Sequence, residues 1–362
     1  MQYFSPNRIF MIMILIVLAS CSPNNEKIIV AVVLPMNGPV TETRYVIEGL
    51  ELASHEINEN GGVNGKHIDL IVSESYLDAA SIRRAFVELE RNAEPLFYIS
   101  VTDIISLELG SVAEKYSVVI GGLASSIQQE VHRQNWTFSY FSTVEQEVLP
   151  IHQILEQLNV KKLGIIYQND QLGRLYEKKL RTSFTGPERK ILSESFEYSS
   201  PGSVKYSTLT DLCDAIYVTG FTDNLAEILR ELRARHYSGI ILADSGLASL
   251  NLLSTKYNDI YLPAPVLYNF NNAYANSTKK RYEERYLKKF THFAANGYDF
   301  IHIVAGLLEN KHLSRDTVRS RLLSQFSYPG VFGYIEKQEG EHYLNFSLYP
   351  ARVVGGKIHY LE

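Results

Sequence analysis

Short apolar runs alternate with amphipathic segments along the chain from residue 28 onward. The first run, residues 28–34, is followed by apolar residues at helical spacing between Val46 and Ile57. Unbroken apolar runs are typical of parallel strands that helices cover on both faces, because such strands expose no side to water. The alternation therefore predicts an α/β fold made of βαβ units.

The pattern divides into two doubly wound parallel-sheet lobes. It runs through residues 28–140 and begins again after residue 143. The last third of the chain has two helical segments but too few strands for a third domain, so we expect returns near residues 263–269 and 328–333. Three crossings between the lobes would form a three-segment hinge. The predicted partition is residues 28–140 and 268–329 for lobe one, and residues 141–267 and 330–362 for lobe two.

The N-terminal segment has the features of an export signal. Arg8 provides a positive charge, residues 9–18 form an apolar run, and small residues lead to Cys21. The run is too short for a stable transmembrane helix. Residues 18–21 resemble a bacterial lipobox, which implies acylation of Cys21, and the alternative is an ordinary secretory signal with an incidental cysteine. We predict a signal peptide at residues 1–20, a lipidated Cys21 and a tether at residues 21–27.

The composition argues against several function classes. The formal net charge is −5, so nucleic acid is not an expected partner. Cys213 is the only cysteine besides Cys21, and we expect it to be a buried small hydrophobe rather than half of a disulfide. The ten histidines lack metal-ligand spacing, and the chain has no Gly-x-Ser-x-Gly motif. We therefore expect no catalytic residues, no metal and no cofactor, and the protein is not predicted to be an enzyme.

Several motifs follow one another in a long, ordered succession. Residues 33–39 read VLPMNGP, residues 48–53 read EGLELA, and residues 56–65 read EINENGGVNG. Further segments lie at residues 170–174, 228–233 and 296–299. Together they resemble the leucine/isoleucine/valine-binding family of type I periplasmic binding proteins over nearly the whole chain after the signal segment.

The resemblance implies a function as well as a fold. The family supplies substrate-binding proteins to branched-chain amino acid ABC transporters, which implies capture of a small amino-acid-like or carboxylate-bearing ligand by hinge closure. It also implies ABC permease subunits as partners and a monomer that the acyl anchor holds to the cell envelope, on its periplasmic or outer cell-surface side. A different function for the same fold is a ligand-sensing or protein-binding envelope lipoprotein without a transport role.

The resemblance also places a ligand at the loops that follow the strands. The carboxylate of the ligand would contact the hydroxyls of Thr102 and Ser125 and the main chain around Leu123 and Ala124. Hydroxyl groups are competent donors for such a carboxylate. The alternative role of these two hydroxyls is to cap the helices that begin in the same loops.

The aromatic wall of the family's site falls on Leu172, Phe221 and Tyr298. The first two are apolar, which favours a ligand with an apolar part. The alternative is that these side chains belong to the core.

Two positions depart from the family pattern. Ser245 replaces the acidic residue that usually meets the amino group of the ligand, and Asp244 or Asp223 would have to take over that role. An offset of one residue at a strand end reverses the direction of the side chain, so recognition of an amino group stays open. In lobe one, Arg44 stands in a loop that often has glycine; pointing into the cleft, it would favour an extra negative charge on the ligand, and otherwise it is solvated. The change at Ser245 is what keeps the sensing function open.

Overall fold

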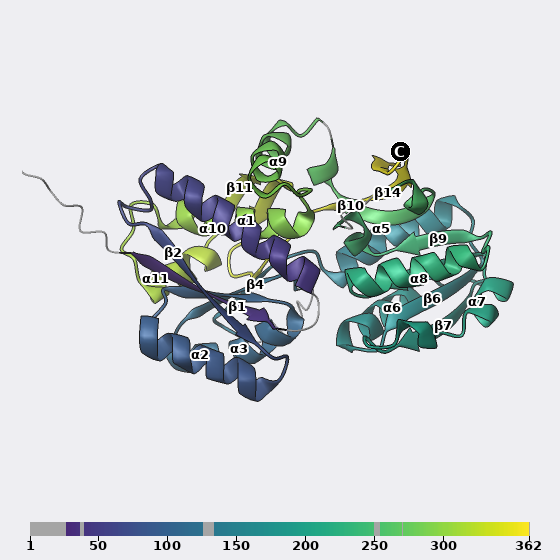
Figure 1. Cartoon of the computed structure of the whole chain (residues 1–362), viewed down its shortest axis with the longest axis horizontal. Coiled ribbons are helices and arrows are strands. Elements are labelled where there is room, and N and C mark those ends of the chain that lie inside the picture. Colours follow the sequence, from purple (N-terminus) through teal and green to yellow (C-terminus); the bar gives the residue numbers. More distant parts are fainter. Residues whose placement is uncertain (1–26, 37–39, 126–133, 250–253, 270, 362) are drawn as a thin grey trace, which may run out of the picture.

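Two sheets, one in each lobe, organise the structure (Figure 1). The computed structural model describes residues 27–36, 40–125, 134–249, 254–269 and 271–361. The predicted signal peptide and the predicted lipidation site at Cys21 lie outside the described residues.

Lobe one is built on a six-stranded sheet in the order β13-β5-β4-β3-β1-β2, and every pairing in it is parallel. Its strands are β1 (Ile28–Pro35), β2 (Ile68–Ser75), β3 (Phe97–Val101), β4 (Val119–Leu123), β5 (Thr137–Tyr140) and β13 (Tyr343–Leu344). Its helices are α1 (Val40–Glu59), α2 (Ala79–Ala93), α3 (Asp103–Tyr116), α9 (Ala273–Tyr286), α10 (His292–Leu308) and α11 (Arg315–Leu323). A hairpin of β11 (Phe326–Gly330) and β12 (Gly333–Lys337) follows α11.

Lobe two is built on a seven-stranded sheet in the order β15-β14-β10-β9-β8-β6-β7. Its strands are β6 (Lys162–Gln168), β7 (Lys190–Phe196), β8 (Ala215–Thr219), β9 (Ile240–Ala243), β10 (Ile260–Pro265), β14 (Leu348–Val354) and β15 (Lys357–Tyr360). Its helices are α5 (Val144–Gln157), α6 (Gln171–Ser183), α7 (Tyr206–Leu212) and α8 (Thr222–Ala234), with short 3₁₀ turns that include η2 (Ser245–Ser249) and η4 (Val266–Tyr268). β14 and β15 are antiparallel additions to an otherwise parallel sheet.

Strand β1 shows why an unbroken apolar run forms the centre of a sheet. Val30 and Val32 pack with the core that includes α1 and α10, whereas Ala31 and Val33 pack with α2 and α3. Figure 1 shows these helix pairs on opposite faces of the lobe-one sheet. Both faces of the strand are therefore buried, as the sequence predicts. Cys213 is also buried, as predicted, and burial raises the pKa of its thiol to about 11.

The chain crosses between the lobes three times, which confirms the predicted three-segment hinge. The first crossing follows β5 at residues 141–143, and the second follows β10 at residues 266–272. The crossings lie side by side. β10 and β14 pair antiparallel with Pro265 opposite Leu348, and the ring of Phe141 meets the ring of Phe346 edge-on at a centroid distance of 5.9 Å.

The third crossing corrects the predicted lobe boundary. The sequence predicts it near residues 328–333, whereas the structure places it at residues 345–347. The reason is that β13 pairs with β5 in the lobe-one sheet, and Phe332 and Phe346 pack in the lobe-one core. Residues 330–344 therefore belong to lobe one rather than lobe two.

Helices α1 and α10 cross at a pair of glycines. A Cβ atom at Gly49 would overlap the carbonyl oxygen of Ala294, and one at Gly297 would overlap the carbonyl oxygen of Val46. The two backbones are in direct contact, so neither position has space for a side chain. This contact joins two segments that are far apart in the sequence into one lobe.

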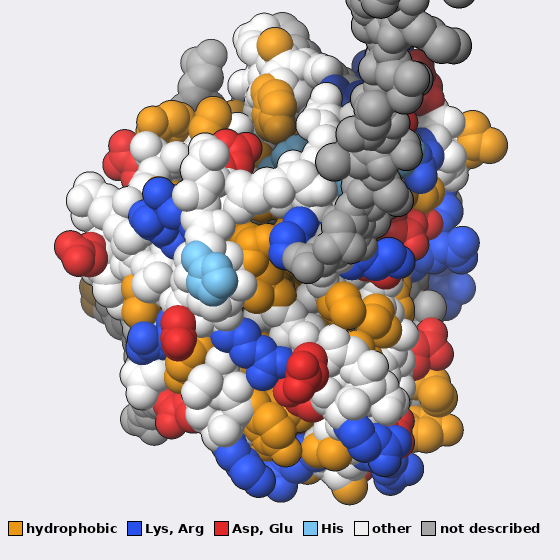
Figure 2. Space-filling view, turned by 90° about the vertical axis from the view of Figure 1, so that its left-hand side faces the viewer, with side chains coloured by type: hydrophobic (Ala, Val, Ile, Leu, Met, Phe, Trp, Pro, Cys, Tyr) orange, Lys and Arg blue, Asp and Glu red, His pale blue; other side chains and the backbone are white. Residues whose placement is uncertain are grey.

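The outer end of lobe one has a mixed surface. Figure 2 shows acidic and basic side chains interspersed with apolar ones over the visible described part of this end. This mixture fits the modest net charge of −5.

We expect Gly297→Ala to lower the free energy of unfolding by at least about 2 kcal/mol, because the added methyl group forces two packed helix backbones apart. Gly306→Ala on the same helix is the matched control. A Cβ there meets no described atom within 4 Å, so we expect a gain of up to about 1 kcal/mol from helix propensity. Urea denaturation followed by circular dichroism measures both, and equal effects of the two changes would contradict the contact.

Candidate functional site

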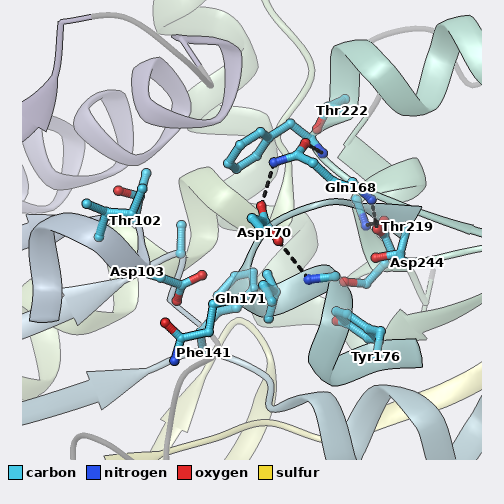
Figure 3. A pocket seen from close by; sticks show the side chains of 18 of the residues that line it. Thr102, Asp103, Phe141, Gln168, Asp170, Gln171, Tyr176, Thr219, Thr222 and Asp244 are labelled. Atoms are coloured by element: carbon cyan, nitrogen blue, oxygen red, sulfur yellow. Dashed lines mark hydrogen bonds between the residues drawn. The ribbon is translucent and has the colours of Figure 1, made fainter. Parts of the chain in front are cut away.

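A cavity of about 360 Å³ lies between the lobes, at the carboxyl ends of the parallel strands. From lobe one it is lined by residues that follow β3 and β4, and from lobe two by residues that follow β6, β8 and β9. In lobe two, β6 and β8 flank the point where the strand order reverses, and in lobe one the order reverses between β1 and β3, with β4 next to β3. Such points are where open α/β sheets bind ligands. Figure 3 shows Thr102 and Asp103 on one side of the cavity and Gln168, Thr219 and Asp244 on the other.

Six of the ten predicted ligand-binding residues line this cavity. They are Thr102, Ala124, Leu172, Phe221, Asp244 and Ser245. They come from both lobes, so the fold brings together side chains that are far apart in the sequence. That they bind a ligand stays a prediction.

The lobe-one side has strained backbone at two lining residues. Thr102 has φ +84° and Ala124 has φ +48°, although neither is glycine. Thr102 is 7% exposed, and its hydroxyl has no hydrogen-bond partner among the described residues. A strained, buried and unpartnered polar group at a cavity wall is typical of a functional site.

The other predicted donors of lobe one are already used by the protein. Ser125 Oγ donates to Asp103 Oδ1 at 2.7 Å, and the N–H of Ala124 donates to Asn296 Oδ1 at 2.9 Å. Leu123 is buried in β4, where its carbonyl accepts from the N–H of Thr102. Neither Ser125 nor Leu123 lines the cavity, and their contact with a ligand carboxylate stays a prediction.

An acidic residue that the sequence analysis missed lies against Ser245. Ser245 Oγ donates to Glu147 Oε1 at 2.7 Å, and its N–H donates to Glu147 Oε2 at 3.1 Å. Glu147 lies in the first turn of α5, lines the cavity and is 2% exposed. The available signal was the helical spacing of Val144, Val148 and Ile151, which places Glu147 on the buried face of its helix.

Asp244 lies close to Glu147 and completes an acidic pair. Its Oδ2 accepts from the N–H of Gly220 at 3.0 Å, and its Oδ1 accepts from the N–H of Gly246 at 2.9 Å. Burial, and then the charge of Glu147, raise the pKa of Asp244 to about 7; burial raises the pKa of Glu147 as well. Both carboxyl groups are buried in the cavity wall, so ionisation of one makes ionisation of the other less favourable.

Aromatic rings supply the apolar surface of the cavity. Phe141 from the first crossing stacks on Phe293 of α10 at a centroid distance of 5.7 Å and an angle of 8°. On the lobe-two side, Phe221 packs edge-on against Tyr198 at 5.5 Å. The sequence analysis missed Phe141 and Phe293, because neither residue type nor spacing marks them as different from core aromatics.

Two predicted residues lie elsewhere. Tyr298 is buried between helices, where its hydroxyl donates to Glu56 at 2.7 Å and accepts from Arg281 at 3.0 Å. The face of α10 that carries Tyr298 turns toward α1, and Phe293 of the same helix reaches the cavity instead. The side chain of Arg44 is 70% exposed and pairs with Glu48, so it does not point into the cavity.

The described helices include none that is long and apolar enough to span a membrane. Within the same described ranges, no three His, Cys, Asp or Glu side chains gather in a way that would hold a metal ion.

The lobes, the crossings and the cavity between them define a two-lobed solute-binding protein. A family model described as periplasmic binding protein matches residues 27–357. The chain therefore belongs to the periplasmic binding protein family, whose members bind solutes outside the cytoplasm, and this confirms the resemblance seen in the sequence.

Solved structures share the fold at low identity. The branched-chain amino acid transporter substrate-binding protein LivJ of Streptococcus pneumoniae, in complex with isoleucine, has a TM-score of 0.81 at 20% identity, over 92% of this chain and 98% of that one. An ABC transporter solute-binding protein of Rhodopseudomonas palustris, in complex with 3,4-dihydroxybenzoic acid, has a TM-score of 0.81 at 16% identity, over 93% and 96%. The leucine-binding protein LivK of Thermotoga maritima has a TM-score of 0.79 at 19% identity, over 92% and 98%. A search of curated protein sequences finds no significant match. These likenesses confirm the predicted α/β fold class.

Asp244 gives the folding stability a pH dependence. The folded protein keeps this carboxyl protonated up to about pH 7, whereas the unfolded chain ionises it near its ordinary pKa of 3.8. The folded state therefore holds more protons between about pH 4 and pH 7, and stability falls as the pH rises, by up to about 1.4 kcal/mol per pH unit, and levels off above. We expect the free energy of unfolding of Asp244→Asn, relative to the wild type, to rise across this window in urea titrations.

Asp223→Asn, the same charge change at an exposed position of α8, is the control for this experiment. A difference between Asp244→Asn and the wild type that stays constant from about pH 4 to pH 7 would count against a raised pKa at Asp244.

Proposed function

We propose that this chain is a lipid-anchored, extracytoplasmic solute-binding protein that captures a small ligand between its lobes and delivers it to an ABC permease. The observation that carries the proposal is the cavity, which both lobes line at their strand ends in a member of the periplasmic binding protein family. The described site offers hydrogen-bonding groups and an apolar surface, and it has no assembled set of nucleophile and base. Binding without chemistry is therefore the function that we assign.

The mechanism that we propose is closure about the three crossings. A ligand that touches Thr102 in lobe one and Phe221 in lobe two makes both contacts only when the lobes are close together. It therefore shifts the equilibrium toward the closed form by its difference in affinity for the two forms. The permease would then recognise the closed form.

A cationic group of the ligand is expected to face the acidic pair in lobe two. Ser245 itself carries no charge, but its hydroxyl donates to Glu147, so the carboxylate of Glu147 lies next to that position. Glu147 can therefore serve as the anionic partner of an amino group on the ligand. The sensing or protein-binding role was favoured only by the missing acidic side chain at Ser245, and that observation no longer supports it. The ligand's apolar part would lie against Phe141, Phe221 and Phe293.

We expect the natural ligand to remain bound through a mild purification, and mass spectrometry of the released material identifies it. Calorimetric titration of the identified compound, with X-ray scattering on the same samples, should give saturable binding and a smaller radius of gyration. Thr102→Val and Phe221→Ala should each weaken binding by about tenfold, because each removes a contact from one lobe.

Leu212→Ala changes an apolar side chain that is 51% exposed and outside the cavity, and it is the control for these two variants. Saturable binding with an unchanged radius of gyration would contradict closure. A similar loss of affinity in all three variants would contradict the assignment of the cavity.

We expect Cys21→Ser to abolish incorporation of labelled palmitate and to release the protein from the membrane fraction, because a lipoprotein anchor depends on the thiol of this cysteine. Cys213→Ser is the matched control, since it removes the other cysteine of the chain and should retain the label. Palmitate incorporation that persists in Cys21→Ser would sink the predicted anchor and leave solute binding untouched.

A further inference from the structure

Resting on the proposed function, we infer that the ligand is a small organic cation whose ammonium group is held by Glu147 and Asp244 and which presents no carboxylate to lobe one. The inference concerns the charge of the ligand at each end of the cavity. It departs from the amino-acid-like or carboxylate-bearing ligand that the sequence resemblance implies.

In lobe one, a carboxylate of the protein accepts from a hydroxyl that the sequence resemblance assigns to the ligand's carboxylate. Asp103 follows Thr102 directly, lines the cavity and accepts the hydroxyl of Ser125 at 2.7 Å. The N–H of Ala124 is taken by Asn296. The hydroxyl of Ser125 and the N–H of Ala124 are thus paired within the protein, and a ligand carboxylate would lie beside the carboxylate of Asp103.

One polar group of this wall is still open. The hydroxyl of Thr102 is more than nine-tenths buried, lines the cavity and has no hydrogen-bond partner among the described residues. This hydroxyl can donate or accept, whereas the neighbouring carboxylate of Asp103 only accepts. The selection against an anion therefore comes from Asp103, and the Thr102 hydroxyl can accept from an ammonium, amide or hydroxyl group of the ligand.

In lobe two, the cavity ends at the acidic pair. Ser245 and Ser142 donate to Glu147, the latter at 3.1 Å, and the N–H groups of Gly220 and Gly246 donate to Asp244. Both carboxyl groups are buried in the cavity wall, so a cation placed between them gains an interaction that water does not screen.

The remaining charges of the described lining agree with this assignment. Asp170 accepts from the N–H of Gly173 at the start of α6, so its carboxylate lies at the positive end of the helix dipole. The guanidinium of Arg174 is the one basic group among the described lining residues, and Arg174 is exposed and donates to Asn169. Four carboxyl groups therefore face one peripheral cation, which favours a positive ligand.

The test uses probes that share one hydrocarbon body and differ in charge. Calorimetric titrations at pH 8 compare isopentylamine, leucine and isocaproate, with cadaverine as a probe that carries an ammonium group at each end. We expect isopentylamine to bind at least about tenfold more tightly than leucine, no binding of isocaproate, and the tightest binding for cadaverine, because its second ammonium faces Asp103 and Thr102.

Two variants measure the contributions of the lobe-one wall and the lobe-two wall separately. Asp103→Asn should bring the affinities of leucine and isopentylamine within about threefold of each other and remove the advantage of cadaverine. Glu147→Gln should weaken both amines by about tenfold or more. Glu145→Gln removes the same charge from the same helix at a half-exposed site outside the cavity, and it should leave all affinities unchanged.

The outcomes distinguish this inference from the proposed function. Tighter binding of leucine or isocaproate than of isopentylamine, with compaction of the protein in X-ray scattering, overturns the cationic ligand and leaves capture by closure standing. Absence of binding with all four probes, while the ligand that co-purifies binds and compacts the protein, overturns the cationic ligand alone. Absence of binding and compaction with the probes and with the co-purified ligand overturns both. Wild-type binding in the stated order, lost on Glu147→Gln but not on Glu145→Gln, supports both.

Discussion

The contact between α1 and α10 holds lobe one together, because these helices lie far apart in the sequence and are separated by most of lobe two. Gly49 and Gly297 allow their backbones to touch, and α10 then reaches across the sheet. Asn296 of α10 binds the loop at Ala124, and Asp299 accepts from the hydroxyl of Tyr140 and from the N–H of Val331. One helix therefore fixes the rim of the cavity, the end of β5 and the segment before β12.

Burial of charge shapes lobe two in a comparable way. Glu147 and Asp244 come from different elements and meet only after β9 and α5 have packed. Each is surrounded by donors, and the phenols of Tyr176 and Tyr217 lie against them as well. Two buried carboxyl groups are costly without a counterion, and a bound cation would relieve that cost. If the ligand is the cation that we propose, the stability of the empty protein and its choice of ligand depend on the same two side chains.

Much of the fold was predictable from the sequence because apolar runs and helical spacing are local properties. The apolar run at β1 predicted a buried strand, and the repeated alternation of apolar runs with helical segments, before residue 140 and again after residue 143, predicted two lobes. The third crossing was misplaced because β13 has only two residues and no pattern of its own. The site was partly predictable, since strand-end loops follow from the fold. Tyr298 lies outside the cavity lining, because position in a helix does not say which face meets a neighbour. The pairing of Ser125 with Asp103 depends on loop geometry that spacing does not contain.

The pairing of β10 with β14 has a consequence for how the lobes can turn. Two of the three connections form a hydrogen-bonded ribbon where they leave lobe two, and the third touches it through Phe141 and Phe346. A two-stranded ribbon flexes easily across its flat face but resists bending edgewise, since edgewise bending would stretch one strand against the other. Rotation of the lobes is therefore biased toward a single axis. If the lobes close on a ligand as we propose, a partner that contacts both lobes could tell the filled form from the empty one by the single angle between the lobes.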